Sequence, residues 1–176
     1  MTKCVALLRG IGPSNPAMRN ENLRQVVEGL GYENVETVIS SGNVLFETER
    51  DDLQEIEAEM ERAWPEQLGF TSTTIIRTNE QLEKLVEADP YGDLEHGAGS
   101  YLLVTFFKSP TAMSFELPHR PPDKPYRLHA MIDDTLFSVI DTTGKTPDLM
   151  SWLENQYGKE ISSRTWKTVN RLLARM

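Results

Sequence analysis

The spacing of apolar and polar residues along the chain predicts its elements of secondary structure. Residues 3–9 carry apolar side chains on both faces, which is typical of a central strand. Apolar residues at helical spacing predict helices over 20–31 and from Asp51 to Pro65, with Asn20 and Asp51 as N-caps and with Pro65 and Gly69 as the stop. Runs rich in β-formers predict strands over 35–39, 44–46 and 73–77.

The first 77 residues therefore follow the order strand, helix, strand, strand, helix, strand. This is the split βαβ order of the ferredoxin-like fold. Because crossover connections are right-handed, the first and second strands are expected to run in the same direction. The loop over residues 10–19 should then lie beside the turn over residues 40–43, at one end of the sheet.

The second half of the chain is predicted to contain further strands and helices. Thr78 and Gln81 have the spacing of a capping box, which predicts a third helix. A strand over 101–107, an irregular proline-rich connection over 109–125, a hairpin over 127–132 and 135–140, and helices over 147–157 and 163–176 follow.

We expect an α+β protein with two tightly joined lobes and no visible sequence repeat. An N-terminal ferredoxin-like βαββαβ lobe, residues 1–77, packs on a second, diverged α/β lobe, residues 78–176, that ends in two helices. The link between the lobes has no flexible composition, so a single domain is the alternative.

Composition and charge narrow the classes of function. The formal net charge of −9 opposes binding to nucleic acid, which requires a basic surface. A single cysteine, Cys4, excludes an internal disulfide and favours the reducing cytoplasm; within an apolar strand it is expected to be a core residue. The apolar stretch near the N-terminus is too short for a signal peptide or a membrane span, so no membrane association is expected.

Several motifs are present only in part. Gly144-Lys145-Thr146 has the end of a phosphate-binding loop, but the motif requires a glycine where Val139 stands. Residues 42–46 distantly match a strand motif of RNA-recognition modules, yet the first strand has no aromatic residue on which a base could stack. The three histidines, His96, His119 and His129, lack the spacing of metal ligands, so neither a metal nor a cofactor is expected.

The better candidate for a site is the end of the first sheet. The topology should bring loop 10–19 and turn 40–43 together beside a helix N-terminus, where a small anionic ligand could bind. The candidate ligand-binding residues are Arg9, Asn15, Arg19, Ser40, Ser41 and Asn43. The alternative is structural: Arg9 pairs with a nearby carboxylate while the turn only reverses the chain.

A second hypothesis is an interaction module that binds another protein, or a second copy in a homodimer, through a sheet edge. The sequence does not decide between the two hypotheses or whether the chain is an enzyme.

Three segments carry a family resemblance. They are Val5-Ala6-Leu7-Leu8-Arg9-Gly10-Ile11, then Ser40-Ser41-Gly42-Asn43-Val44-Leu45-Phe46, and finally Thr165-Trp166-Lys167-Thr168-Val169 with Leu172-Leu173. Together they resemble the bacterial family called domain of unknown function 1697. The resemblance implies an α+β fold related to tandem ferredoxin-like units, and a family without an assigned activity or catalytic residue.

This sequence departs from the pattern of that family in two loops. Many members follow Arg-Gly-Ile with a loop that contains glycine and lysine, whereas residues 12–18 here lack lysine, and Arg19 would have to replace it. Many members also carry Pro-x-Gly after the second-half hairpin, where residues 141–144 read Asp-Thr-Thr-Gly.

Overall fold

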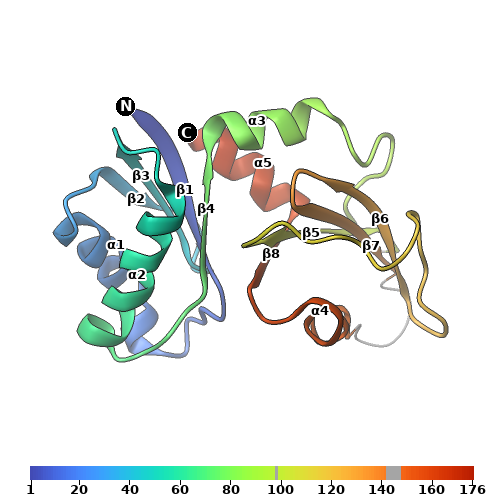
Figure 1. Cartoon of the computed structure of the whole chain (residues 1–176), viewed down its shortest axis with the longest axis horizontal. Helices are drawn as coiled ribbons and strands as arrows, with labels where there is room; N and C mark the ends of the chain where they lie inside the picture. The colour runs from blue at the N-terminus through green and yellow to red at the C-terminus, as the bar shows by residue number, and fades with distance from the viewer. Residues whose placement is uncertain (98, 142–147) are drawn as a thin grey trace. The chain divides into compact units, whose positions relative to one another are not determined.

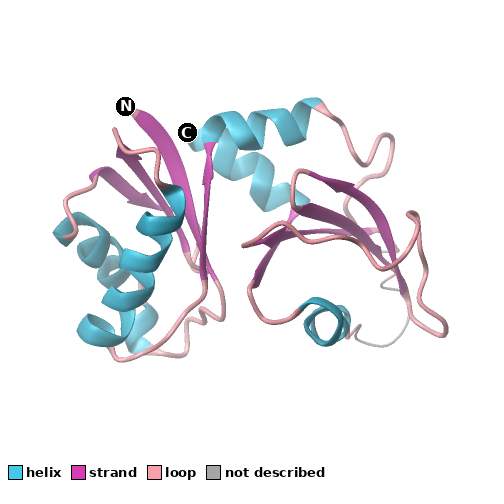
Figure 2. Ribbon diagram, viewed as in Figure 1, coloured by secondary structure: helices cyan, strands magenta, loops and turns pink. Residues whose placement is uncertain are grey.

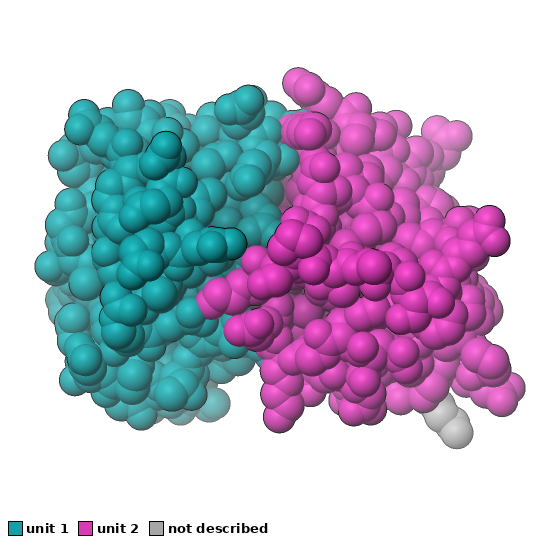
Figure 3. Space-filling view, in the orientation of Figure 1, with its two compact units in different colours: residues 1–83, 172–176 teal, residues 84–171 magenta. Residues whose placement is uncertain are grey.

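The computed structural model describes residues 1–97, 99–141 and 148–176, whose helices and strands appear in Figure 1. They divide into two compact units, which Figure 3 colours separately. The first unit holds residues 1–83 and 172–176, and the second holds residues 84–171. The division into domains, with a boundary after residue 77, stays a prediction.

The first unit has the predicted ferredoxin-like topology. Its elements are β1 (Thr2–Leu8), the 3₁₀ helix η1 (Pro16–Met18), α1 (Asn20–Gly29), β2 (Glu33–Thr37), β3 (Asn43–Thr48), α2 (Leu53–Leu68) and β4 (Thr74–Thr78). The strands form one sheet in the order β2-β3-β1-β4, with every neighbouring pair antiparallel. This order confirms the fold class read from the sequence.

One face of this sheet is covered by both long helices, as Figure 2 shows. Leu23 and Val27 of α1 and Met60 and Trp64 of α2 are buried in the core against this face. The Trp64 indole N–H donates to the Thr74 hydroxyl at 2.9 Å, so the largest core side chain also satisfies its polar atom. The apolar periodicity in the sequence therefore identified the packed faces correctly.

The predicted helix ends are wrong by one to a few residues. Arg19, not Asn20, occupies the N-cap of α1, and Asp52, not Asp51, occupies that of α2. Pro65 lies inside α2, and the helix runs on to Gly69, whose φ of 78° closes it in the left-handed region. Pro65 has no N–H to donate to the Glu61 carbonyl four residues earlier, yet the helix continues past it to Leu68.

The edge strand β4 has its outward N–H groups satisfied by side chains. The N–H of Thr74 donates to the Glu61 carboxylate at 3.2 Å, and that of Ile76 donates to the Glu57 carboxylate at 2.8 Å. The N–H of Thr78 donates to the side-chain oxygen of Gln81 at 2.9 Å. The Gln81 bond belongs to the predicted capping box, which the structure confirms, since the Gln81 N–H also donates to the Thr78 hydroxyl. Side-chain caps of this kind oppose pairing with a further strand.

The second unit repeats the strand order of the first. The chain continues through α3 (Asn79–Glu87), β5 (Tyr101–Phe107), β6 (Tyr126–Ile132), β7 (Thr135–Ile140), α4 (Leu149–Tyr157), β8 (Ile161–Thr165) and α5 (Trp166–Arg175). The sheet order is β6-β7-β5-β8, again antiparallel throughout. The two units thus share an architecture that no sequence repeat revealed.

Two features of this unit differ from expectation. Strand β8 was not predicted, and the last helix begins at Trp166, not at residue 163, because the preceding residues pair with β5. The proline-rich connection over 109–125 occupies the place that α1 has in the first unit. His119 in this connection pairs through both backbone groups with Leu128 of β6, at 2.9 and 2.7 Å.

Candidate functional site

The loop after β1 and the turn between β2 and β3 meet at one end of the first sheet, as the topology predicted. The Leu8 N–H donates to the Gly42 carbonyl at 2.9 Å. Gly42 has a φ of 82°, and a Cβ atom there would stand 2.7 Å from Cγ1 of Ile11. Glycine is therefore required at this position both for its backbone conformation and for the close approach of the loop.

Asparagine side chains hold the turn in shape. The Asn43 side chain is buried, and its Nδ2 donates to the Val38 carbonyl and to the Ser41 hydroxyl, each at 2.9 Å. The Asn20 Nδ2, at the start of α1, donates to the Ile39 carbonyl at 3.1 Å. Asn43 thus has a structural role within the turn. The Asn20 bond joins the turn to the first residue of α1.

The N-terminus of α1 lacks a side-chain cap. Arg19 occupies the N-cap, and its carbonyl accepts from the N–H groups of Asn22 and Leu23. The N–H groups of Asn20 and Glu21 have no partner among the residues that the structure describes. Unpaired N–H groups at the positive end of a helix dipole form a suitable site for an anion.

Three other candidate ligand-binding residues, Asn15, Arg9 and Arg19, differ in their exposure and in their hydrogen bonds. Asn15 is exposed, and its Oδ1 accepts from the Ala17 N–H at 3.0 Å, which caps η1. Arg9 is half-buried directly after β1, where its N–H donates to the Thr73 carbonyl, and burial lowers the pKa of its guanidinium. The Arg19 side chain is exposed and has no partner within the described part of the chain.

The two serines complete this end of the sheet, which we call the anion corner: residues 9–20 and 38–43. Ser40 is exposed and Ser41 half-buried, and the Ser41 hydroxyl accepts from the Asn43 amide. Neither segment contains an aspartate or a glutamate, in a chain whose net charge is −9. Arg9 and Arg19 are the charged side chains of the anion corner, which is therefore locally basic.

The second unit contains an equivalent corner with a different set of charged side chains. After β5, the Phe107 N–H donates to the Asp134 carbonyl at 3.0 Å and the Lys108 N–H donates to the Glu160 carbonyl at 3.1 Å. The first unit makes the same two backbone bonds after β1. The turn here carries Asp133 and Asp134 in place of Ser41 and Gly42, and Asp133 pairs with Lys84 at 2.9 Å, so this corner has carboxylates that the anion corner lacks.

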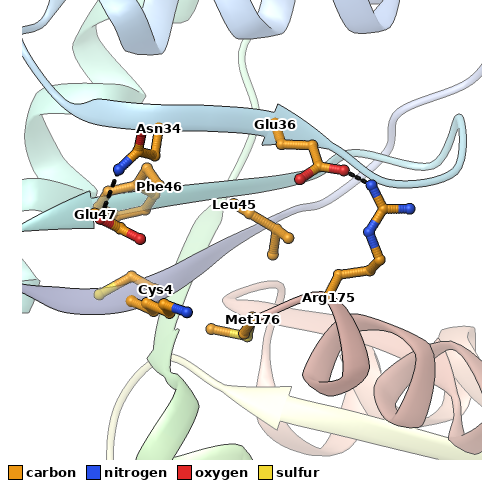
Figure 4. Close-up of a pocket in the computed structure, with 9 residues that line it drawn as sticks. Cys4, Asn34, Glu36, Leu45, Phe46, Glu47, Arg175 and Met176 are labelled. Carbon is orange, nitrogen blue, oxygen red and sulfur yellow. Dashed lines mark hydrogen bonds and ion pairs between the residues drawn. The ribbon is translucent and has the colours of Figure 1, made fainter.

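Two hollows of the first unit lie outside the anion corner. One, of about 120 Å³, is lined by residues of the three strands β1 to β3 and by Arg175 and Met176. Its charged side chains largely pair with one another, because Arg175 bonds Glu36 and Asn34 donates to Glu47, as Figure 4 shows.

The other hollow, of about 330 Å³, is bordered by Arg50, Asp51 and Glu80. Arg50 is engaged with Asp52 and with Glu59, at 2.6 and 2.8 Å respectively, so the carboxylates of Asp51 and Glu80 make this hollow acidic. No residue of the anion corner lines either hollow.

Other chemistry considered from the sequence finds little support in the described residues. Burial raises the pKa of the Cys4 thiol to about 11, so at neutral pH it is a protonated core side chain. Residues 1–97, 99–141 and 148–176 hold no group of three or more metal-binding side chains. The Gly144-Lys145-Thr146 motif lies outside the described residues. Among those described, no helix combines the length and apolar character that crossing a membrane requires.

A comparison with protein families matches residues 1–132 to the family described as Protein of unknown function, DUF1697. The chain belongs to the DUF1697 family. Its fold also matches the structure of conserved bacterial protein SP0830 from Streptococcus pneumoniae, with a TM-score of 0.69 and 22% identity over 99% of this chain and 98% of the other. At this identity the match establishes only the fold of this DUF1697 chain. A comparison with curated proteins gives no match.

Sequence reasoning missed two residues of the anion corner. Asn20 was expected to cap α1, whereas its side chain bonds Ile39. Ile39 adopts a φ of 61° and the residue is 40% exposed, and no sequence pattern predicts this conformation for an isoleucine. For Asn20 the available signal was an asparagine at a helix start within a topology that brings it to a serine-rich turn.

Proposed function

We propose that the protein binds a small anionic ligand at the anion corner. The observation that carries the proposal is an uncapped α1 N-terminus, beside an exposed Arg19 and two serines, with two N–H groups that have no partner among the described residues. Residues 9–20 and 38–43 contain no carboxylate, and Glu21 follows them in the first turn of α1. An anion there would accept hydrogen bonds from the N–H groups of Asn20 and Glu21 and from serine hydroxyls, and would gain the charge of Arg19.

The chemistry of these groups favours phosphate or a phosphorylated metabolite. A phosphoryl group offers three acceptor oxygens and close to two negative charges at neutral pH, which suits several donors converging from a helix end and a turn. Arg9, half-buried directly after β1, is the second positively charged residue of the anion corner. The carboxylate of Glu21 lies in the same first turn and accepts from Gln25 at 3.4 Å.

Thermal denaturation with inorganic phosphate and a set of phosphorylated metabolites tests the proposal. A ligand at a hundred times its Kd stabilises the native state by about 2.7 kcal/mol, a readily measured rise in Tm. We expect that rise to be lost in Arg19→Ala and kept in Arg24→Ala. Arg24 is a matched control because it lies on the same helix and pairs with Glu28 at 2.7 Å, away from the N-terminus.

The second unit suggests a sharper variant. Ser40→Asp with Ser41→Asp gives the anion corner the acidic turn chemistry of Asp133 and Asp134. We expect this double variant to lose the phosphate response, since the two added carboxylates repel an anion. A response of wild-type size in this variant and in Arg19→Ala would show that the ligand binds elsewhere.

A further inference from the structure

Ile39 adopts a backbone conformation that its own side chain disfavours. Its φ of 61° lies in the left-handed region, where a branched Cβ crowds the backbone. The residue is 40% exposed, so burial of the isoleucine does not compensate for this conformation. Something else in the turn must hold Ile39 in place.

Two asparagine amides bind the carbonyl groups next to this strained residue. Asn43 donates to the Val38 carbonyl at 2.9 Å from within the same hairpin. Asn20 donates to the Ile39 carbonyl at 3.1 Å from the start of α1, 19 residues away in sequence. The second bond is thus the one that joins the turn to the helix N-terminus.

The hydrogen bond from Asn20 to Ile39 leaves the other polar atom of the Asn20 amide without a partner among the described residues. A carbonyl oxygen only accepts, so the Asn20 Nδ2 must face Ile39, and the orientation of the amide is fixed. Its Oδ1 is then buried with no partner in the part of the chain that the structure describes. An amide kept in this orientation despite an unpaired oxygen is held there for the hydrogen bond that its Nδ2 donates.

We propose that Asn20 is a positioning residue of the anion corner. By holding Ile39 in the left-handed region, it sets the direction of Ser40 and Ser41 relative to the N–H groups of α1. This inference rests on the proposed function. The free energy of one hydrogen bond is of the same order as the penalty of a left-handed residue, so removing the Asn20 amide releases the turn.

A rescue experiment tests this role. Glycine adopts a positive φ without penalty, so Ile39→Gly removes the need for the hydrogen bond from Asn20. Phosphate binding is measured on the full chain from backbone amide chemical shifts in the wild type, Asn20→Ala, Ile39→Gly and the double variant. We expect Asn20→Ala to weaken binding about five-fold. In the double variant we expect affinity to return to within about two-fold of Ile39→Gly.

Asn22→Ala is the matched control. Asn22 lies in the same first turn, but its Nδ2 donates to the carbonyls of Pro16 and Ala17, so it holds the loop and not the turn. We expect the amide shifts of Ser40 and Ser41 to move in Asn20→Ala and to stay in Asn22→Ala. Unchanged amide shifts along α2, which belongs to the same unit, show that each variant is folded.

The outcomes separate this inference from the proposed function. If the wild type does not bind phosphate, the anion corner fails, and the role of Asn20 fails with it. If the wild type binds and Asn20→Ala binds equally well, only the positioning role is overturned. If Asn20→Ala loses binding and Ile39→Gly does not restore it, Asn20 acts by direct contact, which also overturns positioning.

Discussion

Replacing Glu57 with alanine should destabilise the first unit through its edge strand β4. Glu57 is 3% exposed, and its carboxylate accepts from the Ile76 N–H at 2.8 Å. Hydrogen bonds to charged groups contribute about 1.5–3 kcal/mol, and each kcal/mol shifts the Tm of a chain of this size by roughly 2–4 °C. We therefore expect the Tm to fall by roughly 3–12 °C.

The assay is thermal denaturation followed by circular dichroism, with Glu66→Ala as the control. Glu66 lies on the same helix, is exposed, and has no partner among the described residues, so its replacement should leave the Tm within about 1 °C. Equal melting of Glu57→Ala and Glu66→Ala would refute the reasoning about the edge.

The same edge has a consequence for association. Glu57→Ala with Glu61→Ala leaves the outward N–H groups of Ile76 and Thr74 without their carboxylate acceptors. Light scattering should then detect larger particles than in the wild type, because an open edge pairs with other chains. A double variant that keeps the particle size of the wild type would contradict a protective role for these carboxylates.

Further predictions concern buried polar groups and pH. The Ser138 hydroxyl is buried without a partner among the described residues, so Ser138→Ala should melt at or above the wild-type Tm; a fall of several degrees would contradict this. Cys4 should resist a thiol reagent at pH 8 and react fully in urea, and rapid native labelling would refute its burial. The hydroxyl of Tyr32 and then the guanidinium of Arg50 lower the pKa of the Glu59 carboxyl, so its contribution to stability is present above about pH 4.5 and lost as the pH falls through the lowered value. Urea midpoints should therefore fall more steeply below pH 4.5 in the wild type than in Glu59→Gln, and parallel profiles would contradict this.

The sequence predicted the first unit well because its elements follow regular patterns. The apolar stripes of α1 and α2 and the two-sided burial of β1 are periodic features that depend on local sequence. Helix ends were less certain because caps depend on single hydrogen bonds. The side chain of Asp52, for example, bonds Arg50 and leaves the N-terminus of α2 uncapped.

The second unit was harder to predict because tertiary pairing overrides local preference there. Strand β8 has few strong β-formers, and its pairing with β5 decides its conformation. The proline-rich connection was correctly expected to be irregular, yet its backbone bonds to Leu128 could not be read from composition.

The anion corner was partly accessible from sequence. Strand topology alone brings the loop after β1 to the serine turn, which the bond from Leu8 to Gly42 confirms. The separate roles of its residues could not be predicted from the sequence, because burial and hydrogen-bond geometry decide those roles. Asn43 is directed inward and Arg19 is left exposed, although both looked equally suitable as ligand-binding residues.

A phosphate titration followed by backbone amide chemical shifts tests the central claim most directly. The account predicts saturable shifts at the amides of Asn20, Glu21, Ser40 and Ser41, with none at the acidic turn of the second unit. These shifts should be reduced in Arg19→Ala and of wild-type size in Arg24→Ala. Shifts that are absent, do not saturate, or are centred away from the anion corner would contradict the account.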